Sequence, residues 1–181
     1  MLKKNSLSNL SVSKIFFLSL IICILFYFLE GILGINRLYH PDSIHYMQQN
    51  NENVRDFLDI IFSSPLSILS TGYYYISKLL NHNYFLLIGL NFIFYSLTNI
   101  FIYEKIIKTF CKNHSVSKSL VLFYLLFLDP YRLHLSCHVL KETIYIFIFI
   151  TLIIFNYKFL RLFLVVLLEF FRANSFFYLL I

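Results

Sequence analysis

The stretch Asp129–Glu142 reads DPYRLHLSCHVLKE, and it separates the apolar runs SLVLFYLLFL at 119–128 and TIYIFIFITLIIF at 143–155. It contains an acid, an arginine, two histidines and a Lys-Glu pair, in a chain that is 59% hydrophobic. Ionisable groups at membrane depth are costly and are usually retained for function. The stretch therefore predicts a polar region between two apolar helices.

The position of the first break in this region follows from Pro130. The run from Ser119 to Leu128 is about 15 Å of helix, or half a bilayer. Pro130 lacks a backbone donor and disfavours helix at Asp129. Non-helical backbone at that depth is tolerated only where protein buries it or where it lines a wet cavity. We therefore expect a hydrated, charged cavity open to the outer interface.

The whole composition excludes a soluble globular domain. The 181 residues have a mean hydropathy of +0.75, and a folded chain of this kind would present an apolar surface to water. The sequence predicts an all-α integral membrane protein with a single domain, 1–181, and about five transmembrane helices. The expected spans are 15–35, 84–103, 119–140, 141–157 and 160–181, of which the third and fifth are interrupted.

The basic residues predict the orientation. Lys3, Lys4 and Lys14 put the N-terminus in the cytoplasm, because cytoplasmic segments are enriched in Lys and Arg. The first span lacks an A-x-A cleavage pattern and is read as an uncleaved signal-anchor. The basic loop 105–118 then also lies inside, and 36–83 lies outside. The expected location is the cytoplasmic (inner) membrane of a bacterium, with several passes.

The segment 57–80 is a poor span, because it contains Pro65, Gly72 and many serines. We expect it to form short helices in the outer interface, with the tyrosines at 73–75 at headgroup level. A re-entrant segment is the alternative. The three cysteines have no paired spacing, so no disulfide framework is expected.

Two histidines in the opening stretch raise the question of a metal. His134, His138 and Glu142 are spaced i, i+4, i+8, but positions eight apart lie about 12 Å apart along a helix, so one ion cannot use all three. The sequence analysis therefore predicts no metal and no cofactor. The alternative role of the histidines is hydrogen bonding to neighbouring groups.

Three cations are candidates for binding a phosphate. Arg132 and Lys141 lie in the opening stretch, and Arg172 follows the fifth apolar run and returns to the same side. A guanidinium makes forked hydrogen bonds to phosphate, and an ammonium supplies a point charge. The alternative is that these are helix-end charges, with Lys141 paired locally to Glu142.

The first outer loop supplies a carboxylate at Asp42, within the motif Asp42-Ser43-x-x-Tyr46. Asp42 or Ser43 is a suitable cap for a short helix. A carboxylate at this position is also suited to act as a general base toward a sugar hydroxyl. Both roles remain open from the residues alone.

Taken together, DSxxY, YYYISKLL, PYRLHLSCHVLKE and the later FRAN resemble bacterial multispanning proteins of surface-polysaccharide synthesis. These are C-type glycosyltransferases that use polyprenyl-phosphate sugars, and the related oligosaccharide-repeat (O-antigen-type) polymerases. The resemblance implies that Asp42 is the catalytic base, that Lys141 and Glu142 are the LKE opening a span, and that Arg172 is the later arginine. FRAN stands where FRP is more usual.

We add Arg132, Tyr46 and His138 to Lys141, Glu142 and Arg172 as the predicted substrate-binding set. The expected partners are a polyprenyl-linked sugar or oligosaccharide, the lipid bilayer and other envelope-glycan assembly proteins, with no nucleic acid. Because family members are commonly much longer, the chain is expected to be a fragment or a truncated reading frame.

A different class also fits the composition. A small non-enzymatic membrane protein, such as an immunity protein against a pore-forming toxin, is similarly short, basic and rich in apolar spans. A transporter or channel is less favoured, because the second and fourth apolar runs contain few charges.

Overall fold

The computed structural model describes residues 10–35, 41–47, 72–113, 116–155 and 157–171, and it is all-helical over these ranges. The predicted helical class is therefore confirmed. The helices, in chain order, are α1 (Val12–Ile32), α2 (Pro41–Met47), α4 (Gly72–Leu79), α5 (Tyr84–Ile102), the π-helix η3 (Tyr103–Ile107), α6 (Lys108–Asn113), α7 (Val116–Phe127), α8 (Pro130–Ser136), α9 (Glu142–Ile154) and α10 (Lys158–Phe171).

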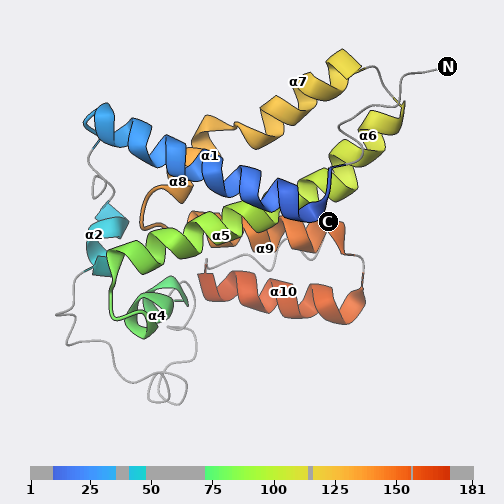
Figure 1. Ribbon diagram of the computed structural model, residues 1–181. Helices are drawn as coiled ribbons and strands as arrows, with labels where there is room; N and C mark the ends of the chain where they lie inside the picture. Colours follow the sequence, from blue (N-terminus) through green and yellow to red (C-terminus); the bar gives the residue numbers. More distant parts are fainter. Residues whose placement is uncertain (1–9, 36–40, 48–71, 114–115, 156, 172–181) are drawn as a thin grey trace.

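Four of these helices form the body of the protein (Figure 1). Helix α5 packs against α1 on one side and α9 on the other, and α10 packs on the far side of α9. The short helix α8 contacts α1, α5 and α9, and α7 contacts the continuation of α5 through η3 and α6. Helix α8 thus lies where three long helices meet.

Two helices in the described part of the chain are long and apolar enough to cross a membrane: Val12–Ile32, with 21 residues, and the continuous helix Tyr84–Phe110, with 27. They correspond to the first and second predicted spans. Helix α9 is apolar but has only 13 residues, about 20 Å at the standard rise. The third predicted span is divided between α7 and α8. Five spans are therefore not shown, and the end of the fifth, 172–181, lies outside the described residues.

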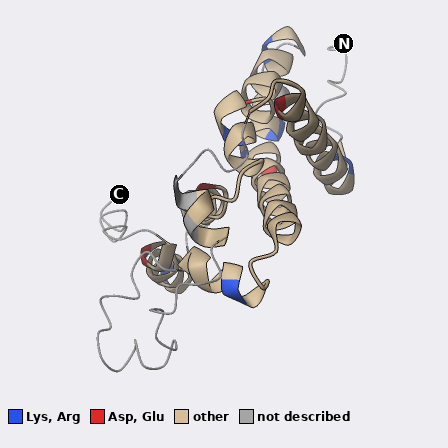
Figure 2. Ribbon diagram, turned by 90° about the vertical axis from the view of Figure 1, so that its left-hand side faces the viewer, with Lys and Arg blue, Asp and Glu red and all other residues tan. Residues whose placement is uncertain are grey.

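The surface of α1 fits the membrane environment. Its side chains Phe17, Ile21, Leu25 and Phe28 are each more than half exposed. Most of the helical ribbon in Figure 2 is tan, which marks residues that are neither acidic nor Lys or Arg. An exposed apolar face of this size is unfavourable in water, and such faces are buried against lipid or against another protein.

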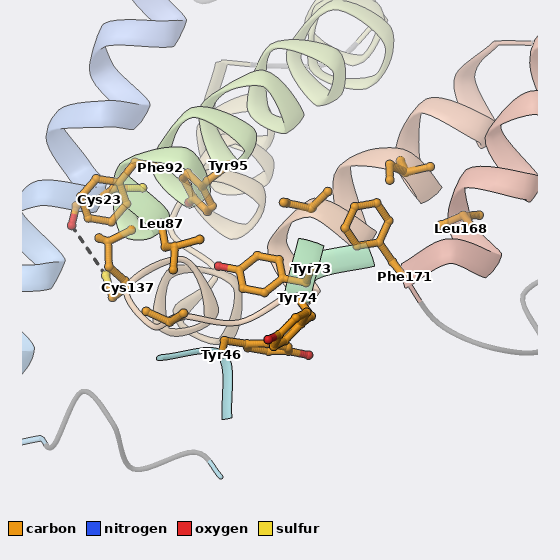
Figure 3. Close-up of a cluster of buried hydrophobic side chains, with 14 of the residues drawn as sticks. Cys23, Tyr46, Tyr73, Tyr74, Leu87, Phe92, Tyr95, Cys137, Leu168 and Phe171 are labelled. Atoms are coloured by element: carbon orange, nitrogen blue, oxygen red, sulfur yellow. Dashed lines mark hydrogen bonds between the residues drawn. The ribbon is translucent and has the colours of Figure 1, made fainter. Parts of the chain in front are cut away.

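Within the described ranges there are two apolar clusters, and the larger one joins most of the helices (Figure 3). Tyr73 and Tyr74 of α4 are buried in it, so these side chains contact protein, although the sequence predicted a headgroup position. Helix α4 also approaches α10 closely at Gly72, where an added Cβ would lie 2.9 Å from the carbonyl oxygen of Phe170. A smaller cluster of Ile15, Ile102, Tyr103, Ile107, Phe123 and Phe127 joins α1, α5, η3 and α7.

The connections divide between the two ends of the bundle. Helices α2 and α4 and the turn between α8 and α9 lie at one end, and α6 and the starts of α1 and α10 lie at the other (Figure 1). This division agrees with the two groups of loops predicted from the charges. The end that contains α2 and the α8–α9 turn collects the candidate site residues.

Candidate functional site

The helix break predicted at Pro130 is present. Helix α7 ends at Phe127, and Asp129 is the N-cap of α8. The Asp129 carboxylate accepts hydrogen bonds from the backbone N–H groups of Tyr131, at 3.0 Å, and Arg132, at 3.4 Å. Pro130 occupies the first helical position, where its missing N–H costs nothing. Asp129 therefore has a structural role in starting α8.

A second break follows α8, and side chains stabilise its backbone. The Asn91 amide donates to the carbonyls of His138, at 2.7 Å, and Leu140, at 3.1 Å. The Ser43 hydroxyl donates to the carbonyl of Val139 at 3.1 Å. Each of the three consecutive carbonyls thus has a side-chain donor from α5 or α2. Buried backbone outside a helix needs such partners, because an unpaired carbonyl in an apolar interior is costly.

The side chain of Arg132 connects the helix break at Asp129–Pro130 to helix α5 through hydrogen bonds. Its guanidinium donates to the carbonyl of Leu126 at 2.9 Å and to the Asn99 side-chain oxygen at 2.7 Å. It also lies 5.0 Å from the centre of the Tyr95 ring, in a cation–π arrangement. Tyr95 in turn donates its hydroxyl to the carbonyl of Phe127. That Arg132 binds a phosphate stays a prediction; these contacts give it a positioning role as well.

A carboxylate and two imidazoles meet where α1 crosses α8. Glu30 Oε1 lies 2.6 Å from His134 Nδ1, and Glu30 Oε2 lies 3.4 Å from His138 Nε2. The two imidazole rings have centroids 4.3 Å apart. Glu30 and His138 are buried, whereas His134 is half-buried. His138, a predicted substrate-binding residue, thus faces Glu30 in the interior.

Glu30 is not among the site residues predicted from the sequence. The available signal was an acid near the end of a strongly apolar run, a position where a charge needs a reason. The prediction from the sequence also missed Asn91, a buried amide in the middle of an apolar helix.

The first predicted catalytic segment lies beside the second break. Helix α2 contains Asp42, whose side chain is outside the described residues, and the hydrogen bond from Ser43 to Val139 connects α2 to the α8–α9 turn. Tyr46 is buried, and its ring centre lies 4.7 Å from that of Tyr73. The backbone of Asp42 is thus next to the turn that leads to Lys141.

Lys141 and Glu142 form the start of α9. Lys141 is the N-cap residue and Glu142 is in the first turn, where a carboxylate interacts favourably with the helix dipole. Both are half-buried. Glu142 Oε2 is buried and makes no hydrogen bond within the described ranges. Arg172 follows the last residue of α10 and lies outside the described residues.

A small cavity of about 10 Å³ lies beside Arg132, with Tyr95, Thr98, Thr143 and Ile146 as its other lining residues. This volume holds about one water molecule. A lipid-linked sugar does not fit within it, so the hydrated, charged cavity expected from the sequence stays a prediction.

The chain shows no significant similarity to any protein-family model, curated protein or solved structure.

Proposed function

We propose that the chain is a multi-pass protein of the cytoplasmic membrane that takes part in assembling a cell-surface polysaccharide. In this proposal it crosses the membrane about five times, with its N-terminus inside and the α2 end of the bundle outside. The reaction is glycosyl transfer or polymerisation from a polyprenyl-linked donor at the outer face. Two long apolar helices, the exposed apolar face of α1 and the grouping of connections at two ends support the membrane part of the proposal.

The observation that carries the enzymatic part is the hydrogen bond from Ser43 to Val139. Asp42 and the Lys141–Glu142 pair are about 100 residues apart in the sequence, yet this bond joins their neighbours. A base and a cation next to one another are what glycosyl transfer from a phosphate-linked donor requires. This bond thus connects the segments of two of the motifs that suggested this chemistry, DSxxY and LKE, while the side chain of Asp42 and the whole of Arg172 lie outside the described residues.

In the proposed reaction, the Asp42 carboxylate takes the proton from an acceptor sugar hydroxyl. The hydroxyl oxygen forms a bond to the anomeric carbon of the donor, and the bond between that carbon and the phosphate oxygen breaks. The polyprenyl phosphate or diphosphate leaves with the electron pair, and the ammonium of Lys141 and the guanidinium of Arg172 stabilise its charge.

The test is complementation of a strain in which the gene has been deleted. Asp42→Asn keeps the size and removes the base, so we expect surface glycan to fall at least about a hundredfold, the lower end of the usual general-base effect. The matched control is Asp56→Asn, which removes a carboxylate from the same predicted outer loop and should leave glycan length and amount unchanged.

Membrane extracts should contain equal amounts of both variants, measured with an epitope tag. Unchanged glycan with Asp42→Asn, in a strain whose glycan depends on the gene, would refute the enzymatic proposal. If deletion of the gene leaves the glycan intact, the proposal of a polysaccharide function fails, and sensitivity to a pore-forming toxin becomes the next property to measure.

A further inference from the structure

We propose that Glu30, His134 and His138 bind a divalent transition-metal ion of the zinc type. One ligand atom from each side chain, an imidazole nitrogen or a carboxylate oxygen, lies within 4.8 Å of the others. The sequence argument against a metal concerned Glu142, which is too far along the chain from His134. It does not apply to Glu30, which reaches the histidines from a different helix.

The donor types select the ion. Two imidazoles and one carboxylate are nitrogen and oxygen ligands that suit Zn²⁺ and neighbouring transition metals better than Mg²⁺ or Ca²⁺, which prefer oxygen alone. Three protein ligands also leave one tetrahedral position for water or for an anionic ligand. The half-buried His134 marks the side on which that position would be reached.

The charges in the cluster favour a cation. Glu30 is 2% exposed and His138 is fully buried. Burying a carboxylate is costly unless a positive charge or several hydrogen bonds compensate for it. Glu30 Oε1 is close to His134 Nδ1, but Oε2 makes no hydrogen bond within the described ranges, although His138 Nε2 is 3.4 Å away. A metal ion between these atoms would satisfy the remaining carboxylate oxygen.

The surrounding contacts hold the ligands in position. The carbonyl of His138 accepts the Asn91 hydrogen bond, which fixes the turn after α8. Cys23 Sγ lies 3.6 Å from Ser136 Oγ, and Cys137 Sγ lies 3.8 Å from the carbonyl of Cys23. These contacts join α1 to the end of α8, and Figure 3 draws the one between Cys137 and Cys23. Tetrahedral ligands with bonds of about 2.0–2.1 Å lie about 3.3 Å apart. Because the ligand atoms of Glu30, His134 and His138 lie up to 4.8 Å apart, zinc binding would bring the two most distant ligand atoms closer by up to about 1.5 Å.

The experiment uses the full chain, purified in detergent without chelators or a histidine tag. After incubation with ZnCl₂ and gel filtration, we expect about one equivalent of zinc by mass spectrometry. Cobalt substitution should give the visible absorption bands of a four-coordinate ion. Glu30→Gln preserves size, and His134→Asn replaces the imidazole with a smaller polar group. Each should lower zinc affinity at least about tenfold, in the range found for groups that support metal sites.

The matched control is His82→Asn, which removes a histidine at the same end of the bundle but outside the cluster. His82 Nδ1 lies 3.0 Å from Ser77 Oγ, and its loss should leave zinc affinity unchanged. His134→Asn changes a half-buried residue, so it provides a folded variant if Glu30→Gln does not fold. Wild-type protein without bound zinc, or equal zinc affinity in the wild type and His134→Asn, would overturn the proposal. Because glycan synthesis is not part of this measurement, its result is independent of the Asp42 test.

Discussion

The hydrogen bonds of Asn91 allow a quantitative prediction for Asn91→Leu. Leucine has a similar volume but no donor, so the substitution leaves the carbonyls of His138 and Leu140 without their side-chain partner. An unpaired buried polar group costs about 1–3 kcal/mol. The carbonyl of His138 keeps the backbone N–H of Leu140 as a partner, at 2.9 Å. The cost therefore falls mainly on the carbonyl of Leu140, and we expect the free energy of unfolding to fall by about 1–3 kcal/mol, a substantial part of the stability of a typical domain.

Ser96→Ala is the matched control on the same helix. Ser96 is also buried, but its hydroxyl donates to the carbonyl of Phe92, one turn earlier in its own helix, at 2.8 Å. That carbonyl keeps its helical backbone partner, so the loss should be below about 1 kcal/mol. Equilibrium unfolding in mixed detergent and SDS, followed by circular dichroism, measures both variants. Hydrogen exchange should also be faster at the amides of 137–141 in Asn91→Leu alone.

A difference between Asn91→Leu and Ser96→Ala of less than about 1 kcal/mol, with unchanged exchange in the turn, would refute this reasoning. It would mean that the carbonyls of the α8–α9 turn find other partners, such as water, once the amide is removed.

Three other predictions follow from the described contacts and the proposed topology. Gly72→Ala places a Cβ against the α10 backbone and should lower the free energy of unfolding by about 1–3 kcal/mol. Its control is Gly89→Ala, because no atom lies within 4 Å of the Cβ added at Gly89. In the same unfolding assay, Gly89→Ala should raise the free energy of unfolding by about 0.4–1 kcal/mol. Arg132→Lys keeps the charge but loses the fork to two acceptors, so the unfolding free energy should fall by about 1–3 kcal/mol; an unchanged value would show that the fork is dispensable. In intact cells, a thiol reagent that cannot cross the membrane should label a cysteine introduced at Asn50 and spare Cys111; the opposite pattern contradicts the proposed topology.

Features that depend on neighbouring residues could be predicted from the sequence. The break at Asp129–Pro130 follows from the proline ring and its effect on the preceding residue. The start of α5 at Tyr84 matches the predicted start at 84, because Asn83 supplies a cap whose side chain accepts a hydrogen bond from the Leu86 N–H at 3.1 Å. Proline effects and caps operate within one helical turn, so they can be recognised without knowledge of the fold.

The polar cluster could not be predicted in the same way. Glu30 and His134 are 104 positions apart in the chain, and no local pattern relates them. The carbonyl partners of the α8–α9 turn likewise come from α2 and α5, through Ser43 and Asn91. The predicted spans 119–140 and 141–157 put a connection at 140/141, but they did not show that helix α8 ends already at Ser136. The sequence contains no proline or glycine there, and the turn depends on donors contributed by other helices.

The separation between Glu30 and its two histidines has a consequence for biosynthesis. Helix α1 is made first, and about 100 further residues must be added before His134 exists. At about 5–20 residues per second, this takes roughly 5–20 seconds. During that interval the carboxylate needs water as its partner, and its position in the last turn of α1 keeps it near the end of the helix, where water is within reach. A ribosome pause before residue 134 would extend that interval. An acid in the middle of α1 would have no water as a hydrogen-bond partner until the histidines had been synthesised.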